Sequence, residues 1–263
     1  RVLSLWCKMV DGVSELPESL AHICNACCRA DGDSFAKSPA TPPATDGEWQ
    51  MDALGPLPKS VFGGYEYAFI ATGRTNNLAW TRPARHRSEM DIAIREHAAW
   101  CASKNYAYNK LIVDGAGETH SASVVDYLRG KSATLSIGCA HEHTGNAGAE
   151  RCIKSITRKS RAFICHGNVT DCPGLWPQAM ACAVQVHNVL PSRDARGEWF
   201  IPCMRAGDAK PNVGNLRVPF CDALVLLMGP ARQSKVLPKR VHAMYTGPDV
   251  MNTHQGWSFA QSG

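Results

Sequence analysis

LIVDGAGET, residues 111–119, and EHTGNAGAERCIKSITRKSRAF, residues 142–163, decide the fold of this chain. In the first segment an apolar run ends on Asp114, and in the second a glycine-bearing loop leads to Glu150 at the start of a basic helix. The two carboxylates are separated by 35 residues, 115 to 149. A third carboxylate, Asp52 in WQMDALGPLP, lies at the end of an earlier strand-like run. Three such acids, brought together, would form a site for hard divalent cations.

Strand and helix patterns surround these segments. A β-meander is predicted first, because three short strand-like runs are separated by GG and by RTNN, which form turns. Helices then alternate with short apolar strands, which predicts crossovers and parallel pairing in a mixed α/β sheet. Reactive groups collect at strand ends in such sheets, where Asp52 and Asp114 are expected. The predicted strands are 49–57, 65–72, 78–83, 110–113 and 133–137, and the predicted helices begin at Ser88 and at Ser121.

The segment from Ala147 to Ile164 predicts a helix with two different faces. One face is suited to the core and carries Ala149, Ile153, Ile156 and Phe163, whereas the other carries Glu150, Lys154, Arg158 and Arg161 at steps of three or four residues. The plain alternative is a solvated amphipathic helix with a Glu–Lys pair. A further apolar helix is expected over 176–190, followed by strand candidates at 216–220, 223–228, 241–246 and 256–259.

Composition favours a folded protein with an anionic partner. The chain has 263 residues, of which 44% are hydrophobic and 19% charged, and this balance argues against wholesale disorder. The net charge of +5 is modest, but basic residues gather at 151–161 and again at 232–240. No apolar run approaches the roughly 18 residues that span a bilayer, so no membrane partner is expected.

The cysteines bear on compartment and on zinc. Twelve cysteines are scattered along the chain, and no signal-peptide pattern precedes them. This combination favours a reduced intracellular compartment. Cys24 and Cys27 have the spacing of half a zinc site, with His22, Cys28 and Cys7 nearby, and the alternative is free thiols packed as small hydrophobic groups. Because the chain begins with Arg1 instead of Met, we expect it to be part of a longer polypeptide or an incomplete gene product.

Six motifs in order resemble the integrase region of copia-type LTR retrotransposon polyproteins. ELPESLAHICNAC is similar to the end of the family's zinc-binding segment, and WQMDALGPLPKSVFGGYEYAF to its first catalytic strand and hairpin. LIVDGAGE resembles the second aspartate motif, and NAGAER resembles the motif that carries the glutamate. LWPQAMACAVQVHNVLPS looks like the Leu-Trp helix, and the segments 210–225 and 234–259 look like the C-terminal part.

The resemblance implies four parts. These are a remnant of the N-terminal zinc-binding segment (1–35), a linker (36–48), a ribonuclease H-like catalytic core with a mixed five-stranded sheet and flanking helices (49–195), and a C-terminal segment that forms a small, incomplete β-domain (196–263).

The resemblance also implies a chemistry. In the family, Asp52, Asp114 and Glu150 would hold two Mg²⁺ or Mn²⁺ ions for 3′-end processing and strand transfer, the work of an endonuclease and polynucleotidyl transferase. Lys154, Arg158 and Arg161 would contact phosphates of double-stranded DNA, both element ends and target. The resemblance further implies a homo-oligomer that acts on chromosomal DNA in the nucleus, and a structural Zn²⁺ at Cys24 and Cys27.

The chain departs from the family pattern at several positions. ATGRTN, residues 71–76, stands where the family usually has Asp-Asp-Phe-Ser-Arg, and Gly115 replaces the Asn that follows the second aspartate. Two alternatives therefore stay open: a catalytically decayed DNA-binding relic, and a nuclease of the same fold that acts by hydrolysis alone.

Overall fold

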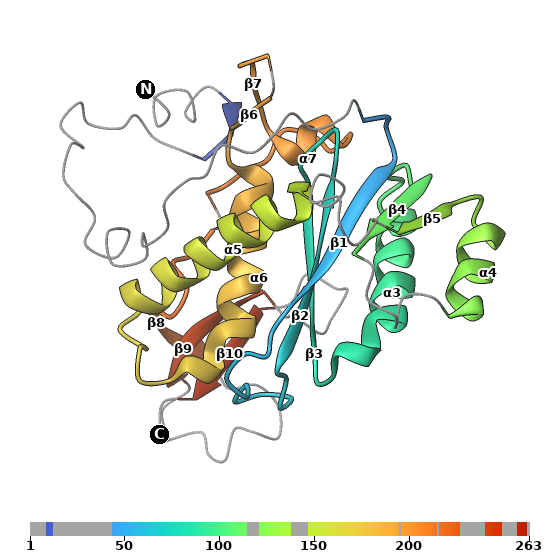
Figure 1. Ribbon diagram of the computed structural model, residues 1–263. Helices are drawn as coiled ribbons and strands as arrows, with labels where there is room; N and C mark the ends of the chain where they lie inside the picture. The colour runs from blue at the N-terminus through green and yellow to red at the C-terminus, as the bar shows by residue number, and fades with distance from the viewer. Residues whose placement is uncertain are drawn as a thin grey trace.

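The structure is a computed structural model (Figure 1). It describes residues 9–12, 44–114, 121–137, 147–194, 196–214, 216–226, 240–248 and 257–261. The predicted zinc ligands Cys24 and Cys27 and most of the predicted linker lie outside these residues.

A mixed five-stranded sheet forms the centre of the fold. Its strand order is β3-β2-β1-β4-β5. The first three strands form an antiparallel meander, whereas β4 and β5 run parallel to β1. This confirms the expected mixed five-stranded α/β sheet with flanking helices. The strands are β1 (Glu48–Leu54), β2 (Tyr67–Gly73), β3 (Ala79–Ala84), β4 (Lys110–Val113) and β5 (Thr134–Ile137).

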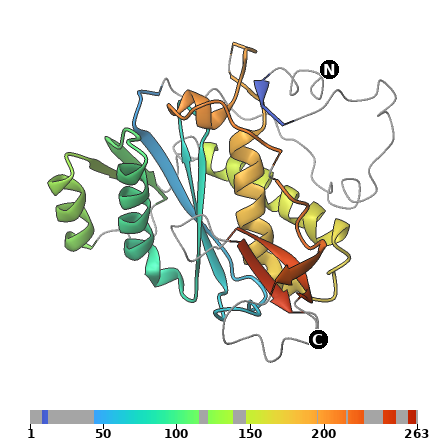
Figure 2. The same ribbon diagram turned by 180° about the vertical axis from the view of Figure 1, so that it is seen from behind.

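Helices cover both faces of the sheet, so the core has three layers (Figures 1 and 2). Helices α3 (Met90–Ser103) and α4 (Ala122–Gly130) lie on one face, and α5 (Ala147–His166) and α6 (Trp176–Val189) lie on the other. Ser121 caps α4, because its side chain accepts a hydrogen bond from the Val124 N–H at 3.3 Å. The predicted helices at these positions are confirmed.

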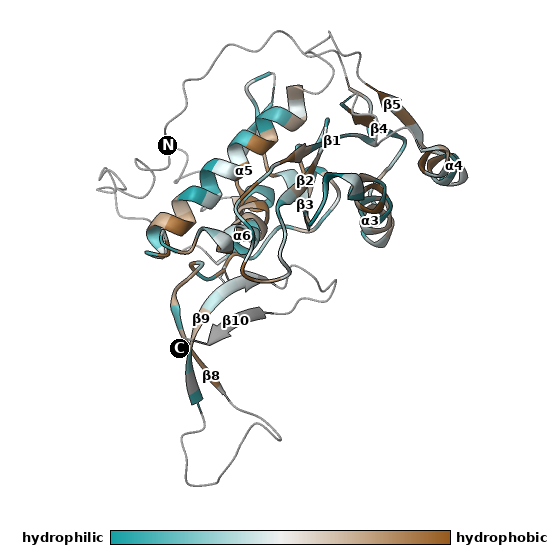
Figure 3. Cartoon of the chain, turned by 60° about the horizontal axis from the view of Figure 1, so that its bottom comes forward, coloured by the Kyte–Doolittle hydropathy of each residue, from teal (hydrophilic) through white to brown (hydrophobic). Residues whose placement is uncertain are grey.

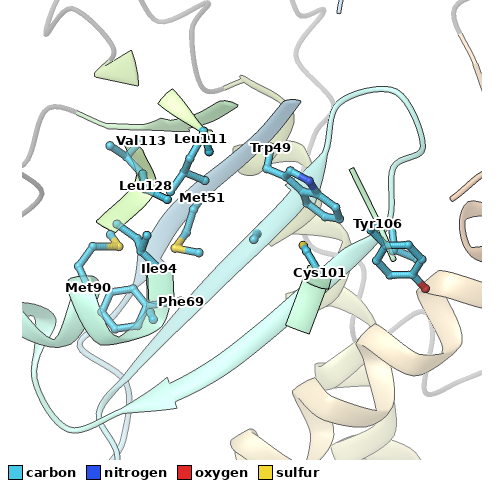
Figure 4. Packing of buried hydrophobic residues seen from close by; sticks show 14 of the residues in the cluster. Trp49, Met51, Phe69, Met90, Ile94, Cys101, Tyr106, Leu111, Val113 and Leu128 are labelled. Atoms are coloured by element: carbon cyan, nitrogen blue, oxygen red, sulfur yellow. The ribbon is translucent and has the colours of Figure 1, made fainter. Parts of the chain in front are cut away.

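The two faces of the sheet bury separate cores. Trp49, Met51 and Phe69 pack with Ile94 and Leu128 on the α3/α4 side (Figure 4). Alternate residues of the same strands point the other way, as the period of two in a β-strand requires. This second core joins Ala68 and Ile70 of β2 to residues of α5 and α6, namely Cys152, Ile156, Trp176, Met180 and Ala183.

A second, smaller sheet follows the core. It has the order β10-β9-β8, with β8 (Asp222–Leu226), β9 (Arg240–Pro248) and β10 (Trp257–Gln261), and β9 lies next to α6 (Figure 2). Two short helical turns lie within the core: η1 (Arg87–Glu89) between β3 and α3, and η3 (Pro173–Leu175) between α5 and α6. Three short elements lie between the two sheets: β6 (Ser192–Arg193), β7 (Trp199–Phe200) and α7 (Pro202–Arg205). Among the described helices, none is both long and apolar enough to cross a membrane.

The strand predicted at residues 216–220 is wrong. The chain makes a turn there, and Phe220 has a positive φ of 64°. Pro219 cannot donate a ladder hydrogen bond, which disfavours a strand. Phe220 instead packs against Leu175 and Ala179, so the apolar run serves as an anchor for the end of the core.

Candidate functional site

Parallel pairing brings Asp52 and Asp114 to the same edge of the sheet. The last register pair of β1 and β4 is Met51 with Val113. Asp52 directly follows Met51, and Asp114 directly follows Val113. Met51 and Val113 are buried on the α3/α4 side, so the following residues turn toward the opposite face. Asp52 pairs across the sheet with Ile70, which belongs to the α5/α6 core. The two aspartates therefore lie on neighbouring strands beneath α5.

Helix α5 brings Glu150 to this face. Glu150 lies in the first turn of the helix and is exposed. Gly148 allows the approach, because a Cβ at this position would collide with the side chain of the buried Gln50 on β1. Gln50 is two residues before Asp52 and thus faces the same side of the sheet. The glycine in the NAGAER motif therefore has a packing reason, which is the close contact between α5 and β1.

Asp114 and Glu150 act electrostatically on Asp52. Burial raises the pKa of Asp52, and the charges of Asp114 and Glu150 raise it further. The backbone N–H of Ala53, which donates to Asp52 Oδ1 at 2.7 Å, and the charge of Arg87 act in the opposite direction. The structure thus places the three predicted acids in one electrostatic neighbourhood. Oxygen ligands of this kind suit Mg²⁺ and Mn²⁺, and a bound cation would remove their mutual repulsion.

These acids lie further apart than the ligands of a bound metal ion do. Among the residues that the structure describes, no three His, Cys, Asp or Glu side chains are gathered closely enough to hold a metal ion. Asp114 and Glu150 each lie near a segment outside the described ranges, 115–120 and 138–146. The type of donor therefore fits a divalent cation, whereas the carboxylates would have to draw together to bind one.

The predicted phosphate contacts lie along α5. Lys154 and Arg161 are exposed and Arg158 is half-buried. Figure 3 shows hydrophilic and hydrophobic segments alternating along the helix. The core face predicted for this helix is confirmed at Ala149 and Ile156, which are fully buried. The C-terminal basic cluster lies mostly outside the described residues, which include only Arg240 from it.

Lys159 differs from the other cations of α5. Its Nζ donates to Ser155 Oγ at 2.6 Å and lies 3.4 Å from His187 Nδ1 on α6. Burial lowers the pKa of Lys159, and burial together with the Lys159 charge lowers the pKa of His187 to about 4. Lys159 thus links α5 to α6.

Two features near the site could not be found in the sequence. Arg87 acts on Asp52 from η1, on the far side of the meander, and no local pattern links the two residues. The departure at 71–76 forms a closed turn: Gly73 N–H donates to Leu78 O at 2.9 Å, and Arg74 forms an ion pair with Glu48. Gly73 and Arg74 therefore stabilise the β2–β3 hairpin and its contact with the start of β1.

Comparisons with known proteins gave one kind of match. No protein-family model matches the chain, and no curated protein matches it. Among solved structures, the chain is similar to the catalytic core domain of BIV integrase, with 13% sequence identity and a TM-score of 0.43. This match covers 62% of the present chain and 94% of the BIV chain.

Proposed function

We propose that this chain is a metal-dependent polynucleotidyl transferase of the integrase kind, which processes the 3′ ends of element DNA and joins them to target DNA. The observation that carries the proposal is geometric: Asp52 and Asp114 each follow the last register pair of β1 and β4, and α5, which packs on β1, carries Glu150 in its first turn. The motif order in the sequence supports the same function, since the three acids fall on the three positions that the family uses.

Asp52, Asp114 and Glu150 would hold the divalent cations. Two Mg²⁺ or Mn²⁺ ions held there would supply activation of the attacking oxygen and stabilisation of the leaving oxygen. The chain itself positions the DNA: Lys154, one turn after Glu150, and Arg158 would contact backbone phosphates, with Arg161 one turn further. Such contacts fix the phosphodiester beside the carboxylates without reading the base sequence.

The decisive assay is Mg²⁺-dependent joining of a short DNA end to plasmid DNA. Wild-type protein is expected to join, and Glu150→Gln is expected to abolish joining while leaving the fold intact, since Glu150 is exposed. Lys104→Gln, an exposed change at the end of α3, is the control and should join normally. Joining that persists in Glu150→Gln would mean that a different carboxylate serves the reaction. A nuclease that only hydrolyses would nick the plasmid and leave no joined product.

A second candidate is a DNA-binding protein of this fold without turnover. The observation that favours it is the absence, among the described residues, of a group of three acids close enough to hold a metal ion. This candidate predicts that Mg²⁺ and Mn²⁺ leave the melting temperature unchanged while DNA still binds. The first candidate predicts a rise, because a cation that binds only the folded state stabilises it by about 2.7 kcal/mol at 100 times its dissociation constant.

Three further parts of the proposal come from the family resemblance alone. They are self-association, action on chromosomal DNA in the nucleus, and a structural Zn²⁺ at Cys24 and Cys27. Sedimentation of the purified protein tests the first, and metal analysis of wild type against Cys24→Ser tests the third.

A further inference from the structure

The loop between β1 and β2 presents two apolar side chains to solvent. Val61 is 56% exposed and Phe62 is 46% exposed. The large apolar side chains on the strands of the meander are buried or partly buried. A contiguous exposed apolar patch rimmed by polar groups marks a binding surface, whereas a single exposed side chain does not, so the surroundings of Val61 and Phe62 decide which case applies.

This loop is held in one conformation. Ser60 Oγ donates to Phe62 O at 2.7 Å and accepts from the Tyr65 N–H at 2.7 Å. Val61 N–H donates to Gly174 O at 3.0 Å, and Trp176 Nε1 donates to a loop carbonyl, that of Pro58, at 2.7 Å. A ligand that contacts Phe62 therefore meets a preformed surface, so little ordering entropy opposes binding.

A cationic turn adjoins the loop. Arg85, His86 and Arg87 are consecutive and exposed between β3 and α3, and Arg85 Nε donates to Gly63 O of the loop at 2.9 Å (Figure 1). Lys59 adds an exposed positive charge on the loop itself.

Glu89, the acidic residue next to this turn, accepts hydrogen bonds from the backbone of the turn. Its Oε1 accepts the backbone N–H groups of Arg85 at 2.7 Å and His86 at 2.9 Å, and its Oε2 pairs with Arg82 at 3.1 Å. Burial would raise the pKa of Glu89, but these hydrogen bonds and the Arg82 charge hold it below its usual value. Glu89 therefore shapes the turn and directs its negative charge inward.

The turn and the loop lie at the end of β1 that follows Asp52. β1 continues from Asp52 to Leu54 and leads directly into the loop, and the Glu66 N–H donates to the O of Ala84, the last residue of β3, at 3.0 Å. A path formed by Lys59, Phe62, Arg85 and Arg87 therefore lies where the chain leaves Asp52 along β1.

We propose that this path, defined by Lys59, Phe62, Arg85 and Arg87, binds a single DNA strand as it leaves the carboxylate site; the inference rests on the proposed function. Cations beside an exposed aromatic ring match a backbone of phosphates with bases that stack, since every base offers a flat face. A duplex hides those faces between base pairs, so the ring selects an unpaired strand. The basic helix α5 would serve the duplex, and the path would serve the unpaired strand.

The test measures binding by fluorescence anisotropy in EDTA, with an oligo-dT strand and a blunt duplex of equal length as probes. Phe62→Ala is expected to weaken strand binding roughly five- to 150-fold, with little change for the duplex. Arg85→Gln is expected to reduce the slope of log affinity against log salt by about 0.7 for the strand. Phe62→Trp should retain strand affinity, which separates stacking from a structural role.

Two control variants match these changes. Met204→Ala removes a side chain that is 41% exposed on α7, at the opposite end of the sheet from the loop (Figures 1 and 2), and should leave both probes unaffected. Lys104→Gln removes an exposed charge at the far end of the 14-residue α3, roughly 20 Å from Arg87.

The outcomes are separable from those of the proposed function. Equal strand binding by wild type and Phe62→Ala, no strand binding by wild type, or an equal loss for duplex and strand would each overturn the inference. Because EDTA removes catalysis from the assay, none of these results depends on turnover. Conversely, absence of Mg²⁺-dependent joining beside an intact Phe62 effect would reject the proposed enzyme and leave the strand-binding path in place.

Discussion

Asp52→Asn tests whether the three carboxylates repel one another in the folded protein. Asp52 and Asp114 follow the last register pair of two neighbouring parallel strands, and such strands lie about 5 Å apart. Coulomb's law gives roughly 1 kcal/mol for two like charges at this spacing in a water-like medium, which suits the exposed Asp114. Asparagine keeps the shape of the side chain and removes its charge. The variant should therefore be more stable at pH 7 by about 1 kcal/mol, or roughly 2–4 °C in melting temperature.

The pH dependence supplies the sharper half of this test. Because burial and the charges of Asp114 and Glu150 raise the pKa of Asp52, the Asp52 carboxyl group holds its proton more tightly in the folded protein than in the unfolded chain. The corresponding stability is complete below about pH 4, where an unfolded aspartate titrates, and is lost as the pH rises through the raised pKa. Asparagine does not titrate, so the advantage of the variant should appear above this window and vanish below it.

Thermal denaturation followed by circular dichroism, from about pH 3 to pH 8, measures the difference between variant and wild type. Asp91→Asn is the matched control, because Asp91 Oδ1 also accepts the N–H of the next residue, Ile92, at 2.8 Å. Asp91 lies in the first turn of α3, where a negative charge is favourable, so its loss should be neutral or slightly destabilising. An Asp52→Asn variant that is less stable at pH 7, or whose advantage is the same at every pH, would refute the reasoning.

Three other predictions concern the scaffold, and chemical denaturation measures each. Gly148→Ala should lower the free energy of unfolding by about 1 kcal/mol, because the added methyl group overpacks α5 against β1. Gly130→Ala, where an added Cβ meets nothing within 4 Å, should raise it by up to about 1 kcal/mol. Equal effects of the two changes would exclude the close contact between Gly148 and Gln50. Arg74→Met should lose about 2 kcal/mol at pH 7, because its ion pair with Glu48 is nearly buried, with side-chain exposures of 9% and 12%. Although burial raises the pKa of Glu48, hydrogen bonds and positive charge lower it overall, so this loss should shrink as the pH falls through the lowered pKa. Ile156→Ala should lower the free energy of unfolding by about 2–5 kcal/mol, because this side chain of α5 is fully buried against the sheet. A smaller loss would mean that α5 does not pack on the sheet.

The sheet could be predicted from sequence because its signals are local. Each strand is a short apolar run bounded by turn residues, and α5 separates apolar from charged positions at helical spacing. The first strand was predicted three residues too long: the chain ends β1 at Leu54, and Gly55 and Pro56 follow with a positive φ at Gly55. Those residues redirect the chain into the loop that carries Phe62.

The surroundings of the acids could not be predicted, because they depend on contacts between distant segments. Nothing in NAGAER indicates that Gly148 meets Gln50, since that contact requires the helix to be docked on β1. The action of Arg87 on Asp52 likewise depends on the meander returning η1 to the end of β1. Sequence patterns report which face of an element is apolar, whereas the partners of that face are set by the packing of the whole core.

Charge placement around the acids constrains how DNA can approach. A cluster of carboxylates repels a polyanion, so phosphate must be drawn in by cations on its flanks and by the bound metal. Helix α5 carries Lys154 and Arg158, and the β3–α3 turn carries Arg85 and Arg87. Under the proposed function, these two groups of cations would hold a strand that crosses the acids at both ends, with its reactive phosphate between them. Removing one flank should therefore weaken binding and also reduce the fraction of bound DNA that reacts, because a strand held at one end samples more positions.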